Sequence, residues 1–164
     1  MYKRCLINVA GIVQGVGFRP YIFRLAHRLQ LSGFVNNSSN GVLIEIEGLI
    51  TNIDKFVKTL KDQPPPLAQI TKIDINEIQQ KEDKTFQILQ SESDDYNNIF
   101  ISPDISTCED CRKELLTRSD PRYFYPFINC TNCGPRYTII SDIPYDRPKT
   151  SMSAFRMCED CQKE

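Results

Sequence analysis

Residues 9–19 read Val9-Ala10-Gly11-Ile12-Val13-Gln14-Gly15-Val16-Gly17-Phe18-Arg19. Upstream of this stretch, apolar residues alternate with their neighbours in the period of a buried β-strand. Downstream of it, Pro20 suits the first turn of a helix, and Gly33 lies just beyond the last apolar position. The stretch therefore predicts a strand, a glycine-containing turn and an amphipathic helix. The strand pattern is carried by Cys5, Ile7 and Val9, and the helix pattern by Ile22, Leu25, Ala26 and Leu29.

The following residues predict a hairpin, a second helix and two further strands. Residues 34–35 and 42–47 have strand character, and the polar segment 36–41 between them predicts the hairpin turn. Thr51 is a candidate N-cap for the second helix, which residues 64–66, all proline, would end. Strands near residues 70–78 and 85–89 complete the order β-α-β-β-α-β. We therefore predict an α+β, ferredoxin-like domain over residues 1–91. The second helix carries its apolar face on Ile53, Phe56, Val57 and Leu60.

Composition excludes several classes of protein. The chain has 164 residues, a net charge of −1 and 40% hydrophobic residues, which is typical of a folded globular protein. No apolar run reaches the ~18–20 residues of a membrane span, and no signal peptide stands out. We therefore predict a cytoplasmic protein that does not bind a membrane. Residues 91–98 are polar and aperiodic, which predicts a linker over residues 92–103. Residues 104–164 are predicted to form an irregular second segment.

The turn between the first strand and the first helix is a candidate anion site. Two glycines that bracket a small residue before a helix allow successive backbone N–H groups to point inward, and the helix dipole adds positive potential. Arg19 at the helix start can bind a phosphate through both guanidinium nitrogens. Asn36 and Asn37 in the hairpin turn offer an amide that could orient a water molecule. The alternatives are an ordinary tight turn and ordinary turn chemistry, and for His27 we expect a structural or surface role.

Six of the seven cysteines form C-x-x-C pairs in the second segment. The first two pairs have the spacing C-x2-C-x18-C-x2-C, which is typical of a structural four-thiolate zinc site. Unligated cysteines or disulfides are the alternative. Because this segment lacks long periodic runs, metal binding would supply the folding free energy that a small apolar core cannot. The predicted ligands are Cys108, Cys111, Cys130 and Cys133.

Cys158 and Cys161 make half of a second site. They could be free or redox-active thiols, could pair with residues beyond 164, or could share a metal with one of the other pairs. Cys5 is expected in the core of the first domain. The aromatic run at residues 121–127 is expected to pack around the metal site. Residues 92–164 carry a net charge of −4, which argues against nucleic-acid binding.

The first half resembles the acylphosphatase family. The resemblance is carried by Gly11-x-Val13-Gln14-Gly15-Val16-Gly17-Phe18-Arg19, Gly33-Phe34-Val35-Asn36-Asn37 and Gly41-Val42. It implies a ferredoxin-like fold that hydrolyses carboxylic–phosphoric anhydrides. It also implies that Gln14, Gly15, Val16, Gly17 and Phe18 cradle the phosphate, that Arg19 binds the phosphoryl group and that Asn37 positions the water.

Nearly the whole chain resembles the N-terminal part of the HypF family of hydrogenase-maturation carbamoyltransferases. The resemblance is carried by residues 17–20, 125–140 and 144–148. It implies that carbamoyl phosphate is the substrate. It also implies that the full-length protein passes a carbamoyl group to its partner HypE, on the route to the cyanide ligands of nickel–iron hydrogenase. Because this family continues into ATP-using domains that 164 residues cannot hold, the chain is expected to be truncated within its second finger.

These observations predict an acylphosphatase domain that hydrolyses carbamoyl phosphate, joined to a zinc-finger segment. Two alternatives stay open. One is a freestanding acylphosphatase with an accessory zinc domain, and the other is a non-catalytic, zinc-dependent interaction module.

Overall fold

The computed structural model describes residues 1–38, 40–89, 105–130, 133–134, 139–142, 147–157 and 159. The predicted linker 92–103 and the pair Cys158 and Cys161 lie outside the described residues. Within these ranges, no helix is both long enough and apolar enough to cross a bilayer. The elements are β1 (Tyr2–Ile12), α1 (Phe18–Arg28), β2 (Ser32–Ser38), β3 (Gly41–Leu49), α2 (Ile50–Asp62), β4 (Gln69–Ile78), β5 (Phe86–Ile88), α3 (Glu109–Leu116) and a short 3₁₀ helix (Arg147–Lys149).

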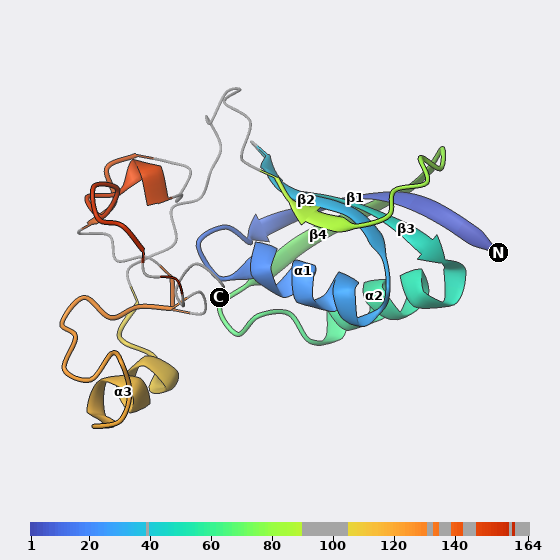
Figure 1. Ribbon diagram of the computed structural model, residues 1–164. Coiled ribbons are helices and arrows are strands. Elements are labelled where there is room, and N and C mark those ends of the chain that lie inside the picture. The colour runs from blue at the N-terminus through green and yellow to red at the C-terminus, as the bar shows by residue number, and fades with distance from the viewer. Residues whose placement is uncertain are drawn as a thin grey trace.

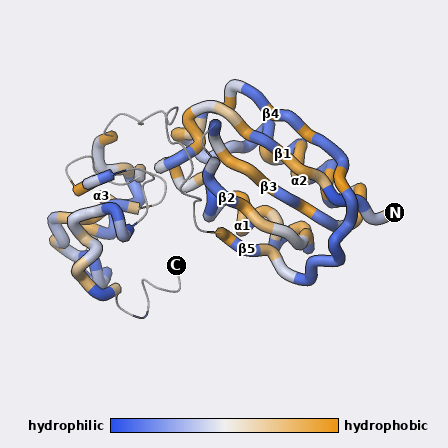
Figure 2. The backbone as a smooth tube through the Cα atoms, turned by 90° about the horizontal axis from the view of Figure 1, so that it is seen from above, coloured by the Kyte–Doolittle hydropathy of each residue, from blue (hydrophilic) through white to orange (hydrophobic). Residues whose placement is uncertain are grey.

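The first half is a five-stranded sheet covered on one face by two helices, so the predicted ferredoxin-like fold is confirmed (Figure 1). The strand order is β4-β1-β3-β2-β5. β1 is antiparallel to β3 and β4, and β2 is antiparallel to β3 but parallel to β5. Because β1 and β2 both run antiparallel to β3, they point in the same direction. Figure 2 shows this sheet from above, with the second half of the chain beside one end.

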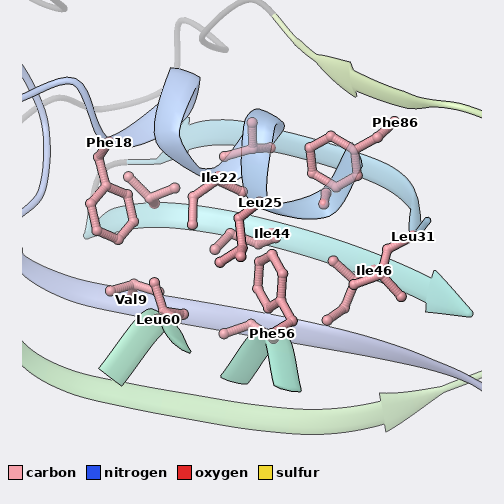
Figure 3. Packing of buried hydrophobic residues seen from close by; sticks show 14 of the residues in the cluster. Val9, Phe18, Ile22, Leu25, Leu31, Ile44, Ile46, Phe56, Leu60 and Phe86 are labelled. Atoms are coloured by element: carbon pink, nitrogen blue, oxygen red, sulfur yellow. The ribbon is translucent and has the colours of Figure 1, made fainter. Parts of the chain in front are cut away.

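The core lies between the sheet and both helices. Side chains of α1, β3 and α2 converge in this layer, and Phe18, Ile44 and Phe56 are each at most 2% exposed (Figure 3). The buried positions of α1 and α2 follow the three-to-four spacing read from the sequence. Cys5 is 7% exposed within this core, as expected. All members of the core lie within residues 5–86, so this domain buries its apolar surface without help from the second half.

Three local predictions were wrong. Gly33 does not end α1: Gln30, with φ 53°, makes the turn after the helix, and Gly33 lies in β2. A β-carbon on Gly33 would lie 2.1 Å from the Glu45 carbonyl oxygen, so glycine is required there by the neighbouring strand. Thr51 is not an N-cap, because β3 continues directly into α2 and the Ile50 N–H donates to the Met1 carbonyl at 3.1 Å.

The third wrong prediction concerns the hairpin turn. Asn36 and Asn37 lie within β2, where they pair with Leu43 and Val42 of β3. The ladder between the two strands extends to Ser38 and Gly41, which leaves a shorter turn than the polar sequence indicates. Polarity marked this segment as a turn, but backbone pairing keeps it in the sheet.

A buried ion cluster on the other face of the sheet was not anticipated from the sequence. Arg4 of β1 is 1% exposed, and its guanidinium nitrogens lie 2.7 Å from Glu47 Oε2 and 2.6 Å from Asp83 Oδ2. It also binds Glu45, two residues before Glu47 on β3. The Lys81 backbone N–H donates to Glu47 at 2.9 Å. The cluster therefore ties the segment between β4 and β5 to the centre of the sheet.

We expect Arg4→Met to lower the free energy of unfolding by about 3 kcal/mol, because it leaves buried carboxylates without their counter-charge. The matched control is Lys3→Met, which removes an exposed ion pair with Glu77 and should leave stability nearly unchanged. Urea denaturation of both variants measures the difference. Equal stability of the two variants would show that the cluster does not stabilise the fold.

The same cluster makes stability depend on pH. Burial raises the pKa of Glu47, but hydrogen bonds from the Lys81 backbone amide and from Arg4 outweigh it and lower that pKa below its usual 4.5. A lowered pKa in the folded state supplies stability above the unfolded value, and this stability is lost as pH falls below it. In the same denaturation series, wild-type protein should therefore lose more stability than Arg4→Met between about pH 6 and about pH 3.

Candidate functional site

The direction of the strands brings the candidate residues to one edge of the sheet. β1 and β2 point the same way, and α1 connects them across one face. The loop that follows β1 and the C-terminal end of β2 therefore lie at the same edge (Figure 1). The loop, residues 13–17, is called the phosphate loop below. This edge holds the loop, the start of α1 with Arg19, and Asn37.

The phosphate loop is anchored by its apolar side chains and shaped by its glycines. Val13 and Val16 are buried in the core, at 0% and 1% exposure. Gly15 and Gly17 have φ values of 71° and 72°, in the left-handed region, and Gly17 caps the N-terminus of α1. Left-handed glycines at alternate positions are typical of an anion-binding nest, and Gly17 lies at the positive end of the α1 dipole.

Gln14 links the phosphate loop to the β2–β3 hairpin. Its side-chain Nε2 donates to the Ser38 carbonyl at 3.0 Å and to the Gly41 carbonyl at 2.7 Å. Gln14 is 7% exposed, and its buried Oε1 accepts no hydrogen bond from the described residues. The two donated bonds hold the loop against the end of β2, one residue from Asn37. Gln14 was expected in the phosphate cradle, but no pattern in the sequence indicates this bridge to the hairpin.

Asn37 and Arg19 occupy this edge from different elements. Asn37 is 6% exposed and shares a sheet face with Val35, the face that α1 covers, because side chains alternate along a strand. Arg19 is half-buried in the first turn of α1. His27 is exposed at the other end of that helix, with its ring 4.6 Å from Phe23, which confirms the surface role expected for it.

The second half contains a cluster of four cysteines that fits a metal ion. The Sγ atoms of Cys108, Cys111, Cys130 and Cys133 all lie within 4.8 Å of one another. Cys108 and Cys130 are 3.5 Å apart, and Cys111 and Cys133 are 3.8 Å apart. Four thiolates bound tetrahedrally to zinc at ~2.3 Å would have edges of about 3.8 Å. The donor set and its spacing therefore fit a closed four-thiolate site.

Burial and hydrogen bonds shift the pKa values of two of these thiols. Burial raises the pKa of the Cys111 thiol far above its usual range, and the neighbouring sulfurs add to this effect. Burial acts the same way on Cys133, but hydrogen bonds, led by that from the Cys130 backbone amide, lower its pKa to about 7. Since a metal ligand must be a thiolate, the cluster must release protons when a metal binds.

The packing around the cysteines corrects one prediction. The aromatic run does not surround the cluster: Phe124 and Phe127 are 67% and 61% exposed. Ile128 and Leu115 pack there instead. Cys108 caps α3, a helix missed from the sequence, by accepting a hydrogen bond from the Cys111 N–H. A run of bulky aromatic residues is buried only where the protein has a core large enough to contain those side chains.

A separate open groove of about 610 Å³ lies between α2 and strands β1 and β4, lined in part by Ile53, Lys58 and Glu77. None of the candidate site residues lines it. The candidate anion site is therefore separate from this groove.

Comparison with known proteins finds matches in both halves of the chain. A sequence profile named acylphosphatase matches residues 5–88, and one named HypF finger matches residues 107–140. A probable carbamoyltransferase HypF from Methanocaldococcus jannaschii is 50% identical over 143 residues, which cover 86% of this chain and 19% of that protein. An acylphosphatase from Ligilactobacillus salivarius is 38% identical over 87 residues, which cover 52% of this chain and 97% of that protein.

A solved structure is similar over both halves. The crystal structure of full-length HypF in the phosphate- and nucleotide-bound form is 49% identical, with a TM-score of 0.91 over 99% of this chain and 22% of that one. The chain thus spans about a fifth of the length of its HypF relatives.

We expect Gln14→Leu to lower the free energy of unfolding by about 1–3 kcal/mol, because it removes the donor from the buried Gly41 carbonyl and from the partly buried Ser38 carbonyl. It should also speed amide hydrogen exchange at residues 40–42. Gln80→Leu is the matched control, since the exposed Gln80 amide donates to a single backbone carbonyl, that of Tyr2 at 2.8 Å. Unchanged exchange in Gln14→Leu would mean that Gln14 does not hold the loop to the hairpin.

Proposed function

The chain belongs to the acylphosphatase family, and we propose that its first 91 residues hydrolyse acyl phosphates, with carbamoyl phosphate as the physiological substrate. The Gln14 bridge is the observation that carries this proposal. It holds the phosphate loop beside Asn37 and the start of α1. An anion-binding nest, a cation and a buried amide meet at one sheet edge, which is what hydrolysis of a phosphate anhydride needs.

In this proposal, backbone N–H groups of residues 14–18 and the Arg19 guanidinium bind the phosphoryl oxygens. Asn37 orients a water molecule for attack on phosphorus, opposite the leaving group. The new P–O bond forms as the bond to the acyl oxygen breaks, and the carboxylate or carbamate leaves with the electron pair. The phosphate itself accepts the proton of the water. Because an acyl phosphate has a good leaving group, positioning and charge stabilisation suffice without a side-chain base.

The HypF relatives are about five times longer than this chain, so the role of the whole protein is a further part of the proposal. We propose that the chain is the N-terminal part of a carbamoyltransferase that matures nickel–iron hydrogenase in the cytoplasm and has HypE as its partner. Support comes from the identity over both halves and from the names of those relatives. Zinc is the metal proposed for the four cysteines, where its role is to hold the finger together. A site closed by four protein ligands leaves no position for substrate.

A non-catalytic role for the finger is the second candidate. Phe124 and Phe127 are exposed on it, and exposed aromatic side chains are typical of surfaces that contact another protein or domain. This role is compatible with hydrolysis in the first half. A freestanding acylphosphatase with an accessory zinc domain remains the alternative for the chain as a whole.

We expect Arg19→Ala to slow hydrolysis of carbamoyl phosphate and acetyl phosphate by on the order of 10²–10³, as for loss of a preorganised charge at the transition state. Arg24→Ala, an exposed arginine on the same helix, is the matched control and should retain full activity. The assay uses the full chain and residues 1–91, with and without a chelator. Wild-type rates of hydrolysis in Arg19→Ala would contradict the enzyme assignment. Absence of turnover both in the full chain and in residues 1–91 would favour the interaction module.

We expect the chain to bind zinc through the four cysteines, and Cys111→Ser to weaken binding by about 100-fold or more, because it removes one thiolate of a closed site. Cys5→Ser is the control, since Cys5 lies in the core of the first domain. Competition with a chromophoric chelator measures both affinities. Equal affinities in the two variants would place the metal elsewhere.

A further inference from the structure

The finger touches the phosphate loop through Gly134, the residue after the last cysteine of the cluster. A β-carbon placed on Gly134 would lie 2.2 Å from the Gly15 carbonyl oxygen, closer than any real side chain allows. Gly134 also has φ +70°, in the left-handed region. The two backbones are therefore in direct contact, and both space and backbone conformation require glycine at position 134.

The metal-binding turn fixes the position of Gly134. Its N–H donates to the Cys130 carbonyl at 2.9 Å, which closes the turn that carries Cys130 and Cys133. The Cys130 N–H points to the Cys133 sulfur at 3.4 Å. Among the described residues, the buried centre of the finger consists of only Cys111, Ile128 and Cys133. Because so small a core is stable only when the thiolates share a metal, metal occupancy controls where Gly134 lies.

On the other side of the contact, Gly15 belongs to the loop proposed to bind phosphate. The Gly15–Val16 peptide is planar, so its N–H points away from the finger when its C=O faces Gly134. Glycine permits this peptide to rotate, which would turn the N–H of the nest around. The Val16 side chain, 1% exposed, anchors one end of the peptide, and the finger blocks the other. A peptide held in this way needs no reordering when an anion binds.

The placement of the finger relative to the acylphosphatase domain recurs in a solved relative. Superposition on full-length HypF covers 99% of this chain with a TM-score of 0.91. A score of this size over both halves requires the finger and the acylphosphatase domain to have the same relative placement in the two proteins.

We propose that Gly134 is a positioning residue for the phosphate loop, so that metal occupancy of the four-cysteine site and anion binding by the loop are thermodynamically coupled. This inference rests on the proposed function in taking the loop as the phosphate site. Coupling is reciprocal: if metal tightens phosphate binding, phosphate must tighten metal binding by the same factor.

The test uses the full chain, zinc and inorganic phosphate. In wild-type protein, removal of zinc should weaken phosphate binding about tenfold, and phosphate should raise zinc affinity by the same factor. Removal of zinc should also speed amide exchange at residues 15–18 without any ligand present. Residues 1–91 have a core that is complete by itself. Their phosphate affinity and amide exchange should equal those of the zinc-free chain and should not change when a chelator is added.

Variants locate the coupling. Gly134→Ala, with zinc bound, should show the weak phosphate binding and fast loop exchange of the zinc-free chain. Gly48→Ala is the matched control, because its β-carbon would press on the end of the Leu31 side chain and meet the backbone of Gln30 and Leu31 at ordinary contact distance, away from the loop. If Gly134→Ala fails to retain zinc, the comparison of zinc-loaded with zinc-free wild-type protein still shows whether metal and phosphate binding are coupled.

The coupling would be overturned if, in wild-type protein, amide exchange in the phosphate loop and phosphate affinity were the same with and without zinc. This outcome does not depend on the rate of hydrolysis. Exchange that responds to zinc in a chain without acyl phosphate hydrolysis would support the coupling and reject the proposed activity alone. The two failures are thus distinguishable.

Discussion

Burial of α1 on a single face of the sheet is the constraint on which the rest of the structure depends. To cover the core, α1 must connect the end of β1 to the start of β2 across one face of the sheet. The two strands therefore run in the same direction, with β3 between them. Parallel strands end at the same edge. The loop after β1 and the end of β2 therefore meet, and the Gln14 amide holds them together with two hydrogen bonds. The position of the candidate anion site thus follows from the packing of an amphipathic helix.

The second half depends on a different physical source of order. Among the described residues its buried centre is small, and four clustered thiols there fit a shared metal ion. The turn that carries Cys130 and Cys133 also places Gly134 against Gly15. One half is organised by side-chain packing and the other around the four cysteines, and they meet at the backbone of the phosphate loop.

Periodic patterns predicted the elements well, and isolated residues predicted them poorly. The faces of α1 and α2 and the core side of β1 are as the spacing indicated, because burial acts on many side chains together. The helix ends and the hairpin turn were predicted wrongly from single residues, namely Gly33, Thr51, Asn36 and Asn37. Pairing between strands and the direct passage of β3 into α2 override the preferences of these residues. Arg4 shows the same limit: a charged residue in an apolar strand gives no sign that Glu45, Glu47 and Asp83 will surround it.

The sequence by itself determined the fold class, the candidate cradle and the cysteine spacing, because periodicity, glycine position and ligand spacing are local properties. The tertiary structure alone decided that Gln14 bridges to the hairpin, that Asn37 lies on a strand, that the aromatic side chains of the finger face outward and that Gly134 touches the loop. The contacts of Gln14 and Gly134 join segments far apart in the chain. Their proximity is set by tertiary packing, which no local pattern of residues records.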